Sequence, residues 1–157
     1  MNEIQELYQQ VILDHNKNPR NYGELPQATN IAEGHNPLCG DHIQITAIIE
    51  NDIIKDLKFQ GSGCAISKAS ASIMTTLVIG KTVEEAKQMF DVFHKIVTSD
   101  IRDRIDTIEL GKMAVFAGVR EYPARVKCAS LSWHTLMQAL DKAQKETAKV
   151  STEIILN

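Results

Sequence analysis

Three cysteines and one aspartate are the residues of this chain best suited to chemistry. Cys39 and Asp41 lie in the stretch Asn-Pro-Leu-Cys-Gly-Asp, Cys64 ends the stretch Gly-Ser-Gly-Cys, and Cys128 follows Arg-Val-Lys. Three thiolates and one carboxylate suit a tetrahedral metal such as zinc. The same residues could instead hold an iron–sulfur cluster. The chain therefore raises a choice between two kinds of metal site.

The residues around two of the cysteines favour a thiolate over a thiol. We expect Cys64 and Cys128 each to begin a helix, where unpaired amides and the helix dipole favour an anion. Lys127 and Arg125 add positive charge beside Cys128. We predict that both cations partly offset the negative charge of a metal bound by three thiolates and a carboxylate.

Glycines flank two of the cysteines. Gly40 follows Cys39 and permits backbone angles that other residues avoid. Gly61 and Gly63 precede Cys64 and let the backbone approach its sulfur closely. We therefore predict that Gly40 and Gly63 support the site.

Each cysteine, taken alone, has a simpler explanation. A lone cysteine is commonly a small buried hydrophobic residue, and the wide spacing of Cys39, Cys64 and Cys128 matches no short zinc-finger pattern. His35 and His42 flank the Cys39 loop, but they suit ordinary strand or surface positions better than ligand positions. The residue pattern alone does not decide whether the three cysteines share a single site.

Composition and charge exclude several other classes of protein. The 157 residues favour one domain, and 43% hydrophobic residues suffice for a core. A formal net charge of −3 lacks the basic surface that nucleic-acid binding needs, so we expect no nucleic-acid partner. We find neither a secretory signal nor a membrane span, and expect a cytoplasmic protein without a membrane partner. In that reducing compartment, three cysteines favour metal binding over disulfides.

The hydrophobic pattern predicts an α+β fold, a small antiparallel sheet with helices packed on one face. Apolar residues at helical spacing predict an opening helix over 4–12, which Pro19 stops. Residues 28–33 predict a short strand. Alternating apolar residues over 41–50 and 53–60 predict an antiparallel hairpin.

Three helices are predicted after the hairpin from the signals at their ends. One begins near Cys64 and ends at Gly80. A capping box of Thr82 and Glu85 opens the next. The last is predicted to start at Cys128.

The remaining segments give weaker signals. Residues 98–106 predict a loop or a helix end, and about residues 107–117 predict a further helix closed by Gly118. We expect residues 1–148 to form a single domain. Residues 149–157 form a C-terminal tail whose strand-like residues have no obvious partner in the sequence.

The cysteine stretches together resemble the U-type iron–sulfur cluster assembly proteins, the family of IscU, SufU and the NifU N-terminal domain. The matching stretches are 36–41, 61–70 and 125–129, with further likeness at 14–15 and 18–21. The resemblance covers about residues 3–145. Three motifs in the family's order are a highly specific signal.

The resemblance implies that the three cysteines converge at one exposed end of the fold. It also implies a role: a cysteine desulfurase leaves a persulfide on its own cysteine, and the U-type protein accepts that sulfur. The protein then builds a cluster or passes the sulfur on to downstream assembly or apo-proteins. Cys39, Asp41, Cys64 and Cys128 match the family's metal ligands one for one, and Cys39 would be the catalytic acceptor.

Three departures from the scaffold branch of the family favour the SufU branch. Lys127 stands where scaffolds usually have a histidine, and residues 122–127 replace the segment that a dedicated Hsp70 chaperone reads. The stretch between Cys64 and Cys128 is longer by about twenty residues, which a surface segment tolerates. The resemblance thus implies a zinc-dependent sulfurtransferase with a SufS-type desulfurase as partner, and it puts the Hsp70 partnership in doubt.

Two rival functions remain open from the sequence. In the first, the four residues hold a transient [2Fe–2S] cluster or iron on a scaffold, and the carboxylate eases its release. In the second, the chain is a structural zinc domain that only binds partners, and zinc removal unfolds it. A thiol–disulfide enzyme is disfavoured because the chain has no Cys-x-x-Cys pair.

Overall fold

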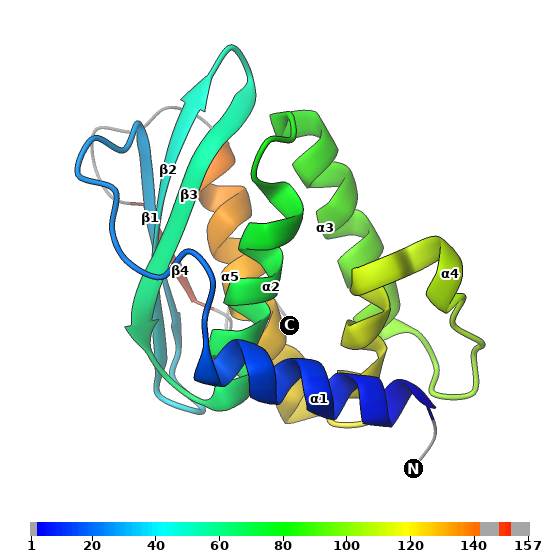
Figure 1. Ribbon diagram of the computed structural model, residues 1–157. Helices are drawn as coiled ribbons and strands as arrows, with labels where there is room; N and C mark the ends of the chain where they lie inside the picture. Colours follow the sequence, from blue (N-terminus) through cyan, green and yellow to red (C-terminus); the bar gives the residue numbers. More distant parts are fainter. Residues whose placement is uncertain (1–2, 142–147, 152–157) are drawn as a thin grey trace.

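The computed structural model describes residues 3–141 and 148–151. Four strands form one sheet, and the helices cover one of its faces (Figure 1). The strand order is β3-β2-β1-β4, with antiparallel pairing of β1, β2 and β3 and parallel pairing of β4 with β1. The strands are β1 Asn30–Asn36, β2 Asp41–Glu50, β3 Ile53–Ser62 and β4 Ala148–Ser151. The predicted α+β fold is confirmed.

The hairpin of β2 and β3 forms where the alternating pattern predicted it. Ile43, Ile45 and Ala47 are buried on the face that meets the helices. Asn51 and Asp52 connect the strands with φ of 53° and 65°. Positive φ at both central residues is the backbone of a type I′ turn, whose twist matches the flanking strands.

The helices form the second layer, and none in the described residues is long and apolar enough to cross a membrane. They are α1 Glu3–Lys17, α2 Ala65–Val78, α3 Val83–Thr98, α4 Thr107–Leu110, the 3₁₀ helix η1 Gly111–Val119, and α5 Pro123–Leu140. The predicted capping box of Thr82 and Glu85 is present at the start of α3. Helix α5 lies directly on β1, where a Cβ added at Gly34 would overlap Thr135 Oγ1. Glycine at this position therefore lets the helix approach the strand.

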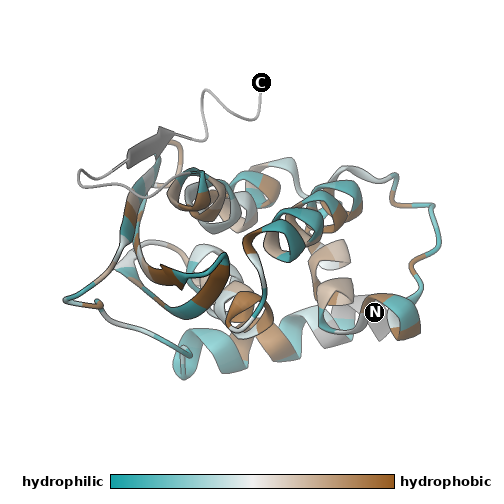
Figure 2. Ribbon diagram, turned by 90° about the horizontal axis from the view of Figure 1, so that it is seen from above, coloured by the Kyte–Doolittle hydropathy of each residue, from teal (hydrophilic) through white to brown (hydrophobic). Residues whose placement is uncertain are grey.

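An aromatic cluster of Phe93, Phe116 and Trp133 fills the space between α3, η1 and α5. The Phe93 ring stacks on Trp133 at 5.0 Å and meets Phe116 edge to face at 4.9 Å between centroids. All three side chains are fully buried. Hydrophobic residues gather on the sides of the sheet and helices that face one another (Figure 2).

Two helix predictions need correction. The last helix begins at Pro123, not at Cys128, because proline lacks an N–H and its fixed φ suits the first turn. The single helix expected over 107–117 is instead α4 followed by η1. Gly111 has a φ of 56°, which ends α4 after one turn.

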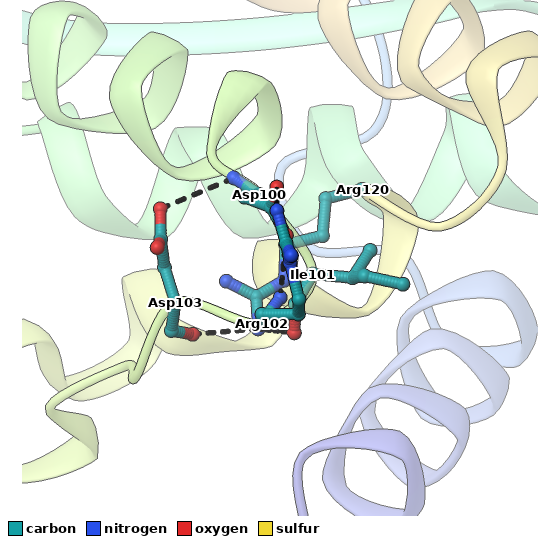
Figure 3. A network of polar contacts seen from close by, with 5 residues as sticks. All are labelled: Asp100, Ile101, Arg102, Asp103 and Arg120. Carbon is teal, nitrogen blue, oxygen red and sulfur yellow. Dashed lines mark hydrogen bonds and ion pairs between the residues drawn. The ribbon is translucent and has the colours of Figure 1, made fainter.

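The loop predicted over 98–106 is present from Ser99, directly after α3. The Arg120 guanidinium donates to the carbonyls of Ile101 and Asp103, at 3.1 and 3.0 Å (Figure 3). It also donates to Ser99 Oγ at 3.1 Å. Asp100 and Arg102 form an ion pair within the same loop. Arg120, directly after η1, therefore links this loop to the end of that helix by hydrogen bonds.

The C-terminal segment contains a strand whose partner the sequence did not reveal. Residues 148–151 form β4, which pairs in parallel with residues 32–35 of β1. The rest of the expected tail, residues 152–157, lies outside the described residues. The division into a domain over 1–148 and a tail stays a prediction.

Candidate metal centre

Cys39 lies on the turn that joins β1 to β2, and Asp41 is the first residue of β2. Asn36 and Asp41 are paired across the two strands, so residues 37–40 form the tip of a hairpin. Cys39 is exposed on this tip, whereas Asp41 is fully buried at the start of β2. Gly40 between them has a φ of 71°, a left-handed conformation that favours glycine.

Cys64 is the N-cap of α2, and its backbone is hydrogen-bonded to Asp41. The Cys64 Sγ accepts a hydrogen bond from the Ser67 N–H at 3.4 Å. The Cys64 N–H donates to Asp41 Oδ1 at 2.8 Å. A Cβ added at Gly63 would lie 2.5 Å from the same oxygen. Gly63 therefore makes room for the Asp41 carboxylate, rather than for the Cys64 sulfur as we expected.

Cys128 approaches the site from α5. It lies in the second turn of that helix and is 2% exposed. Its Sγ is 3.2 Å from Cys39 Sγ, and Asn36 Nδ2 donates to it at 3.7 Å. The helix-start argument thus applies to Cys64 and not to Cys128, whose amide is already within the helix.

The four predicted ligands converge at one end of the sheet. Cys39, Asp41 and Cys128 each offer a ligand atom within 4.8 Å of the other two. Cys64 lies beside this group, with its Sγ 3.8 Å from Asp41 Oδ2. Residues that lie up to 89 positions apart in the sequence are thereby brought into direct contact.

Comparison with known proteins decides the family. Residues 7–129 match the family model of the NifU-like N terminal domain. The chain belongs to this family.

The relatives of this NifU-like domain include a sulfurtransferase and a scaffold protein. The chain is 44% identical over 138 residues to the zinc-dependent sulfurtransferase SufU of Bacillus subtilis, covering 88% of the chain and 92% of the relative. It is 38% identical over 143 residues to the iron–sulfur cluster assembly scaffold protein IscU of Streptococcus pyogenes, covering 91% and 88%. A solved structure from Fervidobacterium islandicum, provisionally described as a scaffold protein for the SUF system, has a TM-score of 0.77. It is 36% identical and covers 87% of the chain and 98% of its own.

The donor set of this NifU-like domain fits a zinc ion. With Zn–S bonds of about 2.3 Å, two sulfurs on a tetrahedral ion lie about 3.8 Å apart. The Cys39 and Cys128 sulfurs, at 3.2 Å, would need to separate by about 0.6 Å. Thiolates favour zinc or iron–sulfur chemistry over hard cations, and Cys39, Asp41 and Cys128 supply three of the four predicted donors within one group.

Two of the thiols of the NifU-like domain, those of Cys64 and Cys128, have pKa values shifted in opposite directions. The pKa of Cys64 is lowered to about 6, mainly because the Cys128 thiol donates a hydrogen bond to it. The Ser67 N–H acts in the same direction. The pKa of Cys128 is raised by the same bond and by burial. Binding a metal would displace the remaining protons.

The predicted outer residues lie near the site without entering it. Arg125 is exposed on the first turn of α5, and Lys127 is half-buried directly before Cys128. Their role in offsetting the charge of the site stays a prediction. His35 and His42 pair across β1 and β2 and are exposed, and the group of metal-binding residues does not include them.

Sequence reasoning missed two residues that surround the site. Asn36 is fully buried and contacts Cys128. Tyr8 of α1 has a pKa raised to about 12 by burial, opposed by the nearby charge of Arg125. Asn36 was part of the Cys39 motif, but a motif does not show which residue its side chain will meet across the fold.

Proposed function

We propose that this chain is a zinc-dependent acceptor of persulfide sulfur from a SufS-type cysteine desulfurase, acting in cytoplasmic iron–sulfur cluster assembly. The observation that carries the proposal is the exposed Cys39 thiol in contact with the buried Cys128 sulfur, beside the buried Asp41. The likeness to a protein named a zinc-dependent sulfurtransferase supports it. The sulfur would pass to downstream assembly factors or apo-proteins.

Cys39, Asp41, Cys64 and Cys128 would hold the zinc. When bound, zinc supplies a redox-inert centre that keeps the thiolates deprotonated and reduced. The buried members, Asp41 and Cys128, are fixed by β2 and α5. Cys39, on the exposed turn, is the ligand best placed to meet a partner.

Sulfur transfer is a thiol–disulfide type exchange that needs no external oxidant. The Cys39 thiolate attacks the outer sulfur of the desulfurase persulfide. A new S–S bond forms on Cys39, the donor's S–S bond breaks, and the desulfurase cysteine leaves as a thiolate. The exposure of Cys39 admits a protein-bound persulfide, whereas the buried Cys128 is shielded from one.

The test is turnover of a SufS-type desulfurase on L-cysteine, with and without the zinc-loaded protein. We expect stimulation that requires both zinc and Cys39, with a persulfide detected on Cys39 by mass spectrometry. The Cys39→Ala variant should abolish it, while Leu38→Ala, on the same exposed turn, should still acquire the sulfur. Undiminished transfer in Cys39→Ala would overturn the assignment.

A second candidate function is a scaffold on which a [2Fe–2S] cluster is assembled and transferred. The likeness over most of the chain to a protein named an IscU scaffold favours it. Anaerobic reconstitution with iron and sulfide would give visible absorption, whereas a zinc protein is colourless. No stimulation of the desulfurase together with a stable coloured cluster would favour the scaffold. A dedicated Hsp70 partner forms no part of either proposal.

A further inference from the structure

Asn36 has an environment unlike that of a surface asparagine. It is the last residue of β1, and its side chain is fully buried between the Cys39 turn and α5. Its two amide ends make different contacts. Oδ1 accepts a hydrogen bond from the Leu38 N–H at 3.3 Å, and Nδ2 donates to Cys128 Sγ at 3.7 Å.

These contacts join the two halves of the metal centre. The bond to Leu38 restrains the turn that carries Cys39, one residue further on. The bond to Cys128 places an N–H donor on the sulfur of the most buried cysteine. An N–H donor to a thiolate lowers the energy of its negative charge, and outer contacts of this kind orient metal ligands.

We propose that Asn36 is a positioning residue that sets the separation of the Cys39 and Cys128 sulfurs and stabilises the Cys128 thiolate in the metal-bound protein. The proposal rests on the metal site of the proposed function and adds a residue outside the ligand set. Asn36 contacts no substrate, so it acts through Cys128 and the turn.

The chain offers a matched control on the same strand. Asn30, the first residue of β1, is 2% exposed, and its Nδ2 donates to the Ala139 carbonyl of α5 at 2.7 Å. Both asparagines are therefore buried on β1 and donate to α5, at opposite ends of the strand. Only Asn36 reaches the metal centre. Replacing each by leucine removes the amide at nearly constant size.

The experiment compares the wild-type chain, Asn36→Leu and Asn30→Leu by titration with Co²⁺ and by chelator competition for Zn²⁺. We expect Asn36→Leu to bind zinc about 10-fold or more weakly. Its thiolate-to-cobalt charge-transfer band should move to longer wavelength, because the sulfur loses a hydrogen-bond donor. Asn30→Leu should lower the thermal unfolding temperature while leaving the band and the affinity unchanged.

Two results would overturn the proposal. One is an Asn36→Leu variant whose charge-transfer band and zinc affinity equal those of the wild type. The other is an equal loss of affinity in both leucine variants, which would assign Asn36 a merely structural role. If Asn36→Leu does not fold, Asn36→Ala also removes both contacts and is held to the same two readouts.

The readouts are independent of sulfur transfer. Co²⁺ and Zn²⁺ binding require no desulfurase, so a wild-type protein that binds metal but fails to stimulate the enzyme contradicts only the proposed function. If the wild type stimulates the desulfurase but Asn36→Leu binds zinc normally, only the proposed role of Asn36 is contradicted.

Discussion

Helix α5 joins two regions that are held together in different ways. Its second turn carries Cys128 into the metal centre, and its middle carries Trp133 into the aromatic cluster. The metal centre depends on a few polar contacts and on close backbone approach, such as the Cys64 N–H bonded to Asp41. The aromatic cluster depends on rings from three elements, α3, η1 and α5, that pack against one another.

This difference means that the aromatic cluster mainly determines the stability of the fold, whereas the metal centre mainly determines metal binding. A buried ring contributes through its area and packing, so its removal weakens the whole fold. A metal ligand or its neighbour contributes mainly when the metal binds, so its removal should leave the metal-free fold nearly intact. Substitutions at these two places on α5 should therefore have different effects on unfolding and on zinc binding.

The largest effect is expected in the aromatic cluster. Trp133→Ala removes a fully buried ring and should lower the free energy of unfolding by about 3–5 kcal/mol. Zinc bound per folded molecule should not change, because Trp133 and the ligand Cys128 lie on different turns of α5. Urea unfolding of the metal-free protein and zinc analysis of the folded fraction measure the two quantities. A variant that loses zinc but keeps its stability would break the separation of the two regions.

The next effect is expected from a methyl group at the metal centre. Gly63→Ala places a Cβ 2.5 Å from Asp41 Oδ1 at a φ of 156°, so the carboxylate must move. We expect zinc affinity to fall by about 100-fold, the upper range for changes around a metal ligand. Gly40→Ala is the control, since its Cβ would meet nothing within 4 Å although its φ is also positive. Equal zinc retention by both variants in a chelator challenge would contradict this account.

The fold and the site could be predicted where the signals are local. The alternation over 41–50 predicted β2, and the pair Thr82 and Glu85 predicted the start of α3. Cys39 and Asp41 are two positions apart, so their proximity followed from the sequence. Their meeting with Cys128 came from the family resemblance, because spacing alone did not show it.

The rest depends on contacts that the sequence does not display. The partner of residues 148–151 is β1, more than a hundred residues earlier. Asn36 meets Cys128 across 92 positions, and no local pattern marks that contact. The start of α5 was misplaced for another reason. Pro123 is a recognisable helix-start signal, whereas the predicted start at Cys128 lies five residues further on, within the helix.

A smaller effect at the metal centre is expected from Asp41→Asn. The amide keeps an oxygen that can accept from the Cys64 N–H, so the fold should survive. The loss of the negative charge should weaken zinc binding by about 10-fold, near 1.4 kcal/mol. Competition with a chelator at constant pH measures the change. Zinc retention equal to that of the wild type would mean that Asp41 is not a ligand.

The smallest effect tests whether the aromatic region responds to acid. His134 packs edge to face on Phe90, with 5.1 Å between ring centroids, and its Nε2 is buried without a hydrogen-bond partner among the described residues. Burial, with the nearby charge of His94, lowers the pKa of His134 from 6.5 to about 4. The unfolded chain therefore binds the proton first. The folded state therefore keeps its full stability, as far as His134 is concerned, above about pH 6.5. It loses stability as the pH falls toward 4.

Between pH 7 and pH 5.5, His134 should thus account for about 1 kcal/mol of lost stability, allowing for its partial exposure. His134→Gln should remove that part of the loss from urea unfolding curves of the metal-free protein. His42→Gln, which replaces an exposed imidazole on β2, should lose stability with pH as the wild type does. If His134→Gln and the wild type lose equal stability, acid sensitivity in this range arises outside the aromatic region. The metal-free thiols would then be the next groups to examine.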